Sequence, residues 1–270
     1  MDTLFLEQFL VWNIPFLAGC LLVGILYVYL FGRFKQNDDA RKKPLFFFLA
    51  LISLYAVTGS PLAAASHLAF SLHMLQMSLL YFIIPPLLLL GVPARLYRRI
   101  RELRVWPTCS NSRRFFLPKT SLLMFGALFL LYHLPFVLDL LAQYSLLQNV
   151  YSVMLFVLAV SMWMPIASPD SNERLAWQEM KRYAWLSGAV IMPACVVFIA
   201  NAFLGGMSNP FGSQYMPQLC TPVQSDSVNG LLPYPFHSEY EQAFAGVLML
   251  GVHKASILMS CRLGNKTDEA

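Results

Sequence analysis

Long apolar runs separated by short basic stretches are the feature that most limits the fold of this chain. All 19 Lys and Arg residues fall in four stretches, at residues 33–43, 95–119, 174–182 and 254–266. Each interval between them is long enough for one or two membrane-crossing helices, so every basic residue can lie on one side of a bilayer. Lys and Arg prefer the cytoplasmic side of membrane proteins. The pattern therefore predicts a polytopic membrane protein with one basic face.

The lengths of the apolar runs predict how many times the chain crosses the bilayer. A transmembrane helix needs about 20 mostly apolar residues to cross about 30 Å of hydrocarbon. We expect an all-α integral membrane protein, a single polytopic domain over residues 1–270, with seven transmembrane helices near residues 9–31, 45–64, 72–92, 120–138, 149–167, 184–206 and 240–261. The segment Gly59-Ser60-Pro61 could end the second span early.

The positions of the charges predict the orientation of these spans. Seven spans put the termini on opposite sides, and the basic stretches place the N-terminus outside and the C-terminus in the cytoplasm. Asp2 and Glu7 precede the first apolar run, where a cleaved signal peptide would carry positive charge, so we expect this run to be a retained helix.

Composition limits the classes of partner. Hydrophobic residues make up 57% of the chain and charged residues 12%, which leaves too little polar surface for an ordinary soluble globule. Anionic lipid headgroups at the inner face are enough to explain the basic residues, so nucleic acid is not implied. Residues 94–106 read as a basic amphipathic segment along the inner interface, which would contact lipid or a docking partner. Residues 207–239 form the longest outer loop and contain no Lys or Arg.

Histidines gather in the outer part of the predicted bundle, where we place His67, His73, His133 and His237. On a helix, His73 and Met77 are i,i+4 neighbours and His73 and Gln76 are i,i+3 neighbours, so their side chains share a face. Imidazole together with thioether suits copper, and especially Cu(I). The alternative is that Met74 and Met77 pack in the core and that His73 is a hydrogen-bonded interfacial histidine.

Two further patches contain polar or helix-breaking residues inside predicted spans. Pro85 and Pro86 should kink the third span and free backbone carbonyls, which neighbouring helices or water must satisfy. Glu241 begins the seventh span, where an acid either faces the bundle interior and carries function or favours the dipole of a solvated helix N-terminus. His253 lies deeper, and we expect it to be a packing histidine.

These patches, taken in order, resemble the CtaG-type assembly factors of bacterial haem-copper cytochrome c oxidases. The matching pieces cover nearly the whole chain and are His73-Met-Leu-Gln76, Pro85-Pro-Leu-Leu-Leu-Leu-Gly-Val-Pro93, Tyr132-His-Leu-Pro135, Trp163-Met-Pro165 and Glu241-Gln-Ala-Phe-Ala-Gly-Val-Leu-Met249. Each motif alone is weak, but their order and spacing make the combination fairly specific.

The resemblance implies a membrane protein that is needed to make active oxidase and that helps to load copper into the catalytic subunit. Position by position, it assigns the family's polar motif sites to His73, Met74, Gln76, His133, Glu241 and Met249. We expect His73, Met74, Met77 and His133 to be metal ligands in an outward-facing cavity, with other cavity or supporting residues at His67, Gln76, Glu241, Met249 and His237.

The chain departs from the family pattern at the positions where further histidines are usual. Met77 stands after the glutamine of the third span, and Gln148 and Ser152 stand near the start of the fifth. Glu241 stands where aspartate is common. Thioethers hold Cu(I), whereas Cu(II) prefers nitrogen donors. Either this chain handles Cu(I) through the histidine and methionine residues, or it has lost the metal and kept a scaffolding role.

Other classes of function stay open. A metal-free chaperone for oxidase subunits would use the same residues for packing and capping. A transporter would move copper or a small solute, and a haem-handling protein would use His67, His73 and His133 as axial ligands. We do not expect an enzyme, because the sequence shows no nucleophile and base pair, no phosphate-binding glycine pattern and no paired catalytic carboxylates.

Overall fold

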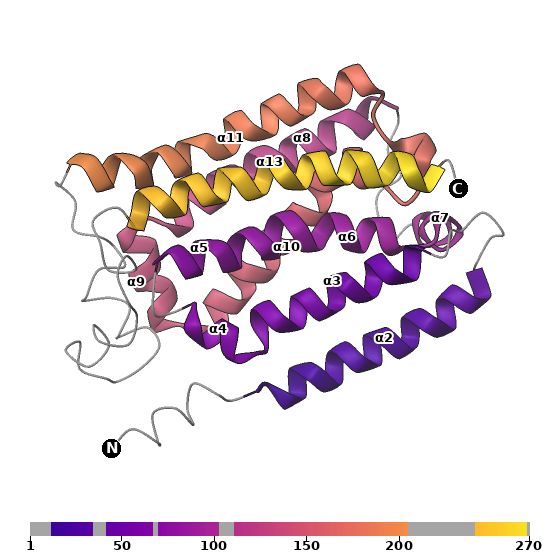
Figure 1. Cartoon of the computed structure of the whole chain (residues 1–270), viewed down its shortest axis with the longest axis horizontal. Coiled ribbons are helices and arrows are strands. Elements are labelled where there is room, and N and C mark those ends of the chain that lie inside the picture. The colour runs from indigo at the N-terminus through magenta and orange to yellow at the C-terminus, as the bar shows by residue number, and fades with distance from the viewer. Residues whose placement is uncertain (1–11, 35–41, 67–69, 103–110, 205–240, 269–270) are drawn as a thin grey trace.

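The chain folds into a bundle of long helices that run alongside one another (Figure 1). The computed structural model describes residues 12–34, 42–66, 70–102, 111–204 and 241–268, and within these ranges every regular element is a helix. His67, His237 and the predicted outer loop lie outside the described residues. The elements are α2 (Ile14–Phe34), α3 (Lys42–Thr58), α4 (Pro61–Ala65), α5 (Phe70–Ser78), the π-helix η1 (Leu79–Ile83), α6 (Ile84–Gly91), α7 (Ala94–Glu102), α8 (Asn111–Tyr132), α9 (Pro135–Gln143), α10 (Ser145–Ala167), the 3₁₀ turn η2 (Ser171–Glu173), α11 (Trp177–Leu204) and α13 (Glu241–Asp268).

Four of the described helical segments are long and apolar enough to cross a membrane: Ile14–Phe34, Phe70–Gly91, Leu146–Ala167 and Glu241–Leu263. These segments support the predicted membrane-helix character of the chain. Helix α3 has 17 residues, and the apolar part of α8 is the shorter segment Pro118–Tyr132. The count of seven spans and their orientation remain predictions.

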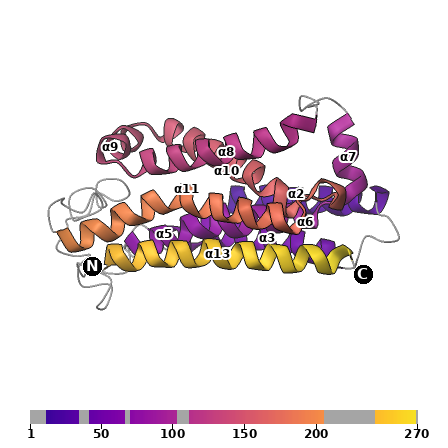
Figure 2. The same cartoon turned by 90° about the horizontal axis from the view of Figure 1, so that it is seen from above.

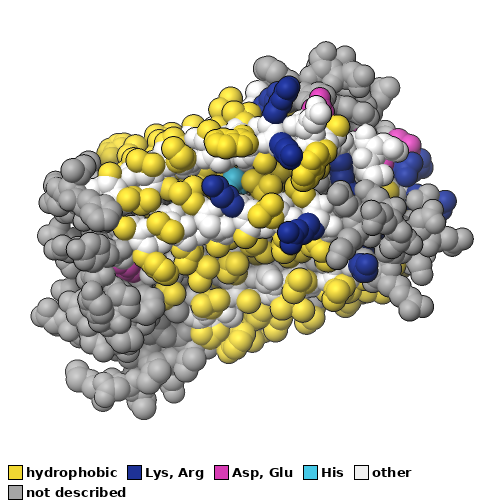
Figure 3. Space-filling model, turned by 45° about the horizontal axis from the view of Figure 1, so that its top comes forward, with side chains coloured by type: hydrophobic (Ala, Val, Ile, Leu, Met, Phe, Trp, Pro, Cys, Tyr) yellow, Lys and Arg dark blue, Asp and Glu magenta, His cyan; other side chains and the backbone are white. Residues whose placement is uncertain are grey.

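Helix α7 lies across one end of the bundle, and we call the opposite end the distal end (Figures 1 and 2). Helices α5 and α13 begin at the distal end, and α8 ends there. In the face drawn in Figure 3, the Lys and Arg side chains lie between the middle of the molecule and the end with α7, and hydrophobic side chains cover most of the rest. This distribution agrees with a chain whose basic residues share one side.

Polar contacts hold α7 against the segment that follows α10. The Tyr97 hydroxyl donates to Glu173 Oε2 at 2.8 Å, and Arg98 Nε lies 3.3 Å from Asp170 Oδ2. The Arg98 side chain is half exposed whereas the Asp170 side chain is nearly buried. The basic segment predicted from the sequence is thus a helix that these two contacts fix to the rest of the protein. Its contact with lipid remains a prediction.

Two predicted spans are interrupted. The second, predicted over residues 45–64, ends as α3 at Thr58 and resumes as the short helix α4 after the Gly59-Ser60 turn. The fourth, predicted over residues 120–138, is wrong beyond Tyr132, because the chain turns at His133 and Leu134 and restarts as α9 at Pro135. A proline lacks the backbone N–H and disfavours helical geometry in the residue before it, so Pro135 ends α8.

Small residues allow the helices to approach closely. A Cβ on Gly91 would lie 2.6 Å from the backbone N of Phe47, so α6 touches the backbone of α3 at this point. The Gly91 carbonyl accepts a hydrogen bond from the Tyr27 hydroxyl at 2.8 Å, and the Tyr27 ring stacks on Phe47 with centroids 3.7 Å apart. Gly246 makes a similar approach between α13 and α11, where a Cβ would lie 3.0 Å from the carbonyl oxygen of Cys195. Close contact at small residues is the usual way in which membrane helices pack.

Candidate functional site

The two adjacent prolines create a locally unwound segment in the middle of the bundle. Because neither Pro85 nor Pro86 has a backbone N–H, the carbonyls four residues earlier, on Tyr81 and Phe82, lose their helical donors. The chain forms the π-helix η1 just before the prolines, and the N–H of Ile84 donates to the Leu79 carbonyl five residues back. A single π-helical turn inside an α-helix is frequent at functional sites.

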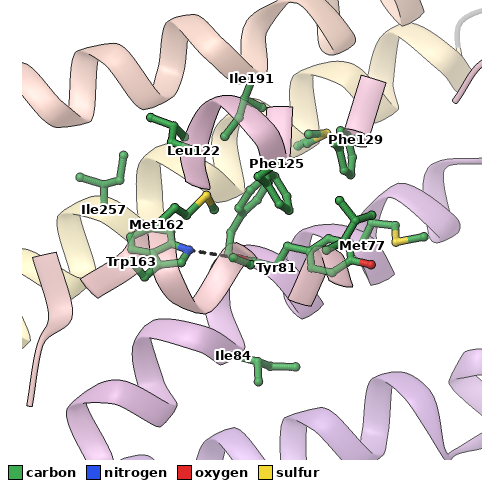
Figure 4. Close-up of a cluster of buried hydrophobic side chains, with 14 of the residues drawn as sticks. Met77, Tyr81, Ile84, Leu122, Phe125, Phe129, Met162, Trp163, Ile191 and Ile257 are labelled. Atoms are coloured by element: carbon green, nitrogen blue, oxygen red, sulfur yellow. Dashed lines mark hydrogen bonds between the residues drawn. The ribbon is translucent and has the colours of Figure 1, made fainter. Parts of the chain in front are cut away.

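Side chains from two other helices satisfy the freed carbonyls. Trp163 Nε1 of α10 donates to the Tyr81 carbonyl at 3.0 Å, as Figure 4 shows, and the Ser256 hydroxyl of α13 donates to the Phe82 carbonyl. Both donors are buried. The sequence-based expectation that neighbouring groups must satisfy these carbonyls is confirmed, and the structure identifies the groups. Trp163 belongs to one of the motifs through which the chain resembles the family. The motif did not indicate that the indole N–H donates to the Tyr81 carbonyl.

A histidine cluster lies between α5 and the end of α8, made of His73, His133, Tyr132 and Phe129. The ring centroids of His73 and His133 are 6.4 Å apart, and the His73 ring stacks on Tyr132 at 6.2 Å. The rings of Phe129 and His133 are 4.6 Å apart. Each histidine is only 5% exposed. The structure thus brings together two of the predicted site residues that are 60 positions apart in the sequence.

His133 has a structural role that fixes its tautomer. Its Nδ1 lies 2.7 Å from the Phe129 carbonyl oxygen, one of the carbonyls that the end of α8 leaves without a helical partner. A carbonyl only accepts, so Nδ1 carries the proton and Nε2 holds the lone pair. A histidine held in this way through one nitrogen presents the other to a metal in a defined orientation. Capping and metal binding by His133 are therefore compatible.

The methionines predicted as ligands are buried. Met74 is 0% exposed and Met77 is 7% exposed, and Met249, which was predicted as a supporting residue of the cavity, is 0% exposed. Met77 and His73 lie four residues apart on one helical run and are both buried, as the predicted shared face requires. Their burial fits both readings, since a thioether packs in a core as readily as it binds a soft metal.

Gln76 makes a hydrogen bond to a neighbouring helix. Its amide Nε2 donates to the Val57 carbonyl of α3 at 2.7 Å, and its side chain is partly exposed while His73 and Met77 are buried. Val57 lies in the last turn of α3, where carbonyls lack helical donors. Gln76 therefore ties α5 to α3, and its predicted role beside His73 stays a prediction.

Glu241 joins the starts of two helices. Its Oε1 accepts hydrogen bonds from the Ser71 backbone N–H at 3.1 Å and from the Ser71 hydroxyl at 3.0 Å, across 170 residues of sequence. Glu241 is the first residue of α13 and Ser71 is the second of α5, so its carboxylate lies near two helix N-termini, both of which favour a negative charge. The alternative placed Glu241 at a solvated helix terminus. Its side chain is only 8% exposed, so the solvated part of that alternative is wrong.

Within the described residues, no three His, Cys, Asp or Glu side chains come together as a potential metal site. The histidine pair is a different case. Two metal–nitrogen bonds of about 2 Å each, together with the radii of the two rings, span about 6 Å, which is close to the 6.4 Å between the centroids. The separation of the His73 and His133 rings is therefore compatible with one shared ion.

Fold and site together define an all-helical membrane protein whose polar residues are buried between helices and tied to backbone breaks. The chain belongs to the family of cytochrome c oxidase caa3 assembly factors, whose model matches residues 25–261. The match includes each of the motifs described above. No curated protein and no solved structure matches the chain.

Proposed function

We propose that this assembly factor receives Cu(I) at the histidine cluster and passes it to a subunit of the oxidase. The observation that carries the proposal is the pairing of His73, on α5, with His133. Both histidines are buried, and so are Met74 and Met77 on α5. Neutral nitrogen and sulfur donors in a dry environment favour a soft monovalent ion over a divalent one, because a divalent ion costs more free energy to desolvate.

Transfer would proceed by exchange of metal ligands, and no covalent bond would form or break. The tautomer of His133 leaves Nε2 as the donor, and a two-nitrogen, thioether-supported ion can pass to a site with more nitrogen donors. The bacterial plasma membrane, an outward-facing cluster and a copper-accepting oxidase subunit are parts of this proposal. It assigns the chain no catalytic step.

Copper titration of the purified protein tests the proposal. A competition assay with a Cu(I)-specific chromophoric chelator would compare the wild type with the His73→Ala, Met77→Leu double variant. The matched control is Met192→Leu on α11, where the side chain is 53% exposed and faces away from the core. We expect the double variant to lose Cu(I) affinity and the control to keep it; unchanged affinity in the double variant would show that the site is wrong.

A second candidate is a metal-free scaffold that binds an oxidase subunit. It is favoured by the structural contacts of the motif residues, because Gln76, His133 and Glu241 each satisfy backbone groups of the bundle. Under this reading, the double variant would still co-purify with oxidase subunits and restore oxidase activity in cells that lack the assembly factor. Loss of activity together with retained co-purification would instead support copper transfer.

A further inference from the structure

His253 is a buried histidine that the proposed function does not use. It lies on α13 toward the middle of the bundle and is 1% exposed. Its Nδ1 is fully buried and finds no hydrogen-bond partner among the residues that the structure describes. A buried nitrogen of this kind costs folding free energy unless something occupies it. The sequence-based reading of His253 as a satisfied packing histidine is therefore incomplete.

The surroundings of His253 are aromatic. Its ring centroid lies 4.9 Å from that of Phe82 in η1 and 6.2 Å from that of Trp163 in α10. Trp163 is held in place by its hydrogen bond to the Tyr81 carbonyl, and the nearby Ser256 hydroxyl is committed to the Phe82 carbonyl. A cation within about 6 Å of an aromatic centroid is attracted by the face of the ring, most strongly by tryptophan.

A thioether lies on the same face of α13. Met249 precedes His253 by four residues and is 0% exposed, so both side chains point into the bundle as i,i+4 neighbours. This spacing repeats, in reverse order, the spacing of His73 and Met77 on α5. The carboxylates of the described residues give this pair no charge partner in any hydrogen bond or ion pair of the structure.

The two His–Met pairs lie on helices that run side by side in the same direction. Ser71 contacts Glu241 at the distal end, and Phe82 contacts Ser256 further along. Met249 falls about midway between these contacts on α13, as Met77 does on the facing run of α5 and η1. Along the bundle, His73 therefore lies nearest the distal end, Met77 and Met249 lie at about the same level, and His253 lies furthest toward the middle.

We propose that Met249 and His253 form a second site for a soft monovalent cation, Cu(I) or its analogue Ag(I), against the rings of Phe82 and Trp163. The donors are uncharged, so a divalent ion would cost far more desolvation than a monovalent one. Imidazole nitrogen and thioether sulfur prefer Cu(I) among the biological metals. The metal identity rests on the proposed function, but the site itself uses none of the residues of the histidine cluster.

Titration of Ag(I) into the purified full chain tests this site, with bound metal counted by mass spectrometry and tryptophan emission recorded at each step. We expect Met249→Leu and His253→Gln each to lose one equivalent of bound ion and to lose the part of the emission change that Trp163 contributes. Met192→Leu is the matched control and should behave as the wild type. Far-UV circular dichroism would establish that each variant keeps its helices.

The His73→Ala, Met77→Leu double variant separates this inference from the proposed function. If the double variant loses an ion while Met249→Leu keeps the full number, the histidine cluster stands and the second site is overturned. If Met249→Leu and His253→Gln lose an ion while the double variant keeps the full number, the second site stands and the proposed function fails. Full occupancy in both Met249→Leu and His253→Gln would overturn the second site.

Discussion

Replacing Ser256 with alanine is expected to destabilise the folded protein, because Pro86 leaves the Phe82 carbonyl without its helical donor. Ser256 is 0% exposed, and its hydroxyl supplies the hydrogen bond that this carbonyl accepts. The substitution removes one oxygen atom and creates almost no cavity, so the cost is that of a buried unsatisfied carbonyl, about 1–3 kcal/mol. Side-chain hydrogen bonds in membrane proteins tend to fall below this range, at about 0.6 kcal/mol on average and about 1.7 at most. The two ranges overlap at about 1–1.7 kcal/mol, and we expect a loss of this size.

The same argument predicts that Pro86→Ala removes the need for Ser256. The restored backbone N–H at position 86 can donate to the Phe82 carbonyl, as in an ordinary helix. In that background, Ser256→Ala should cost less than about 0.5 kcal/mol, the range of substitutions that break no specific contact. The four free energies of unfolding form a double-mutant cycle whose coupling term isolates the contact.

Reversible unfolding in mixed detergent micelles, followed by far-UV circular dichroism, would supply these free energies. Ser161→Ala is the matched control, because the Ser161 hydroxyl donates within its own helix to the Val157 carbonyl at 2.9 Å and is exposed. The control should change stability by less than about 0.5 kcal/mol. An equal cost for Ser256→Ala in both backgrounds would refute the reasoning, since the proline would then not be its cause.

Three other substitutions test the packing and the distal end of the bundle. Gly91→Ala should destabilise the folded protein by about 1–3 kcal/mol, because the new Cβ would lie 2.6 Å from the backbone of Phe47. Gly188→Ala is the control, because a Cβ there would meet nothing within 4 Å. In the same unfolding assay, it should leave the stability unchanged or raise it. Glu241→Gln should cost about 1 kcal/mol, because a neutral acceptor bonds Ser71 more weakly and no longer carries the charge that two helix N-termini favour; no loss of stability would show that the charge is irrelevant there. His133→Asn can still donate to the Phe129 carbonyl and should keep stability within about 1 kcal/mol of the wild type, whereas chelator competition should show weaker Cu(I) binding; unchanged binding would assign His133 to capping alone.

The positions of the helices were largely predictable from the sequence, and their interruptions only in part. Gly59-Ser60-Pro61 was a visible break, and the chain turns there between α3 and α4. Pro135 was equally visible, but hydropathy alone does not distinguish a proline that ends a helix from one inside a helix, such as Pro165 in α10. Whether a proline ends a helix or bends it depends on whether other groups can satisfy the freed carbonyls, and those groups come from elsewhere in the chain.

The candidate site was predictable as a set of residues and not as a set of contacts. His73 and His133 were both expected near one end, and the structure places their rings beside each other. The i,i+3 spacing relates Gln76 to His73, but only the structure shows that its amide donates to the Val57 carbonyl of α3. Ser71, which binds Glu241, carried no motif and could not be singled out.

By itself, the sequence determined the class of this protein: apolar runs of helical length, basic residues confined to four stretches, and prolines that demand external hydrogen-bond donors. These are local properties, set by hydropathy and by the chemistry of single residues. Only the tertiary structure decided that Trp163 and Ser256 donate to the carbonyls that Pro85 and Pro86 leave free, that Glu241 joins two helix starts, and that the ring of His253 lies against the ring of Phe82. Such pairings depend on how helices far apart in the chain pack against one another, and periodicity along one helix carries no information about its partner.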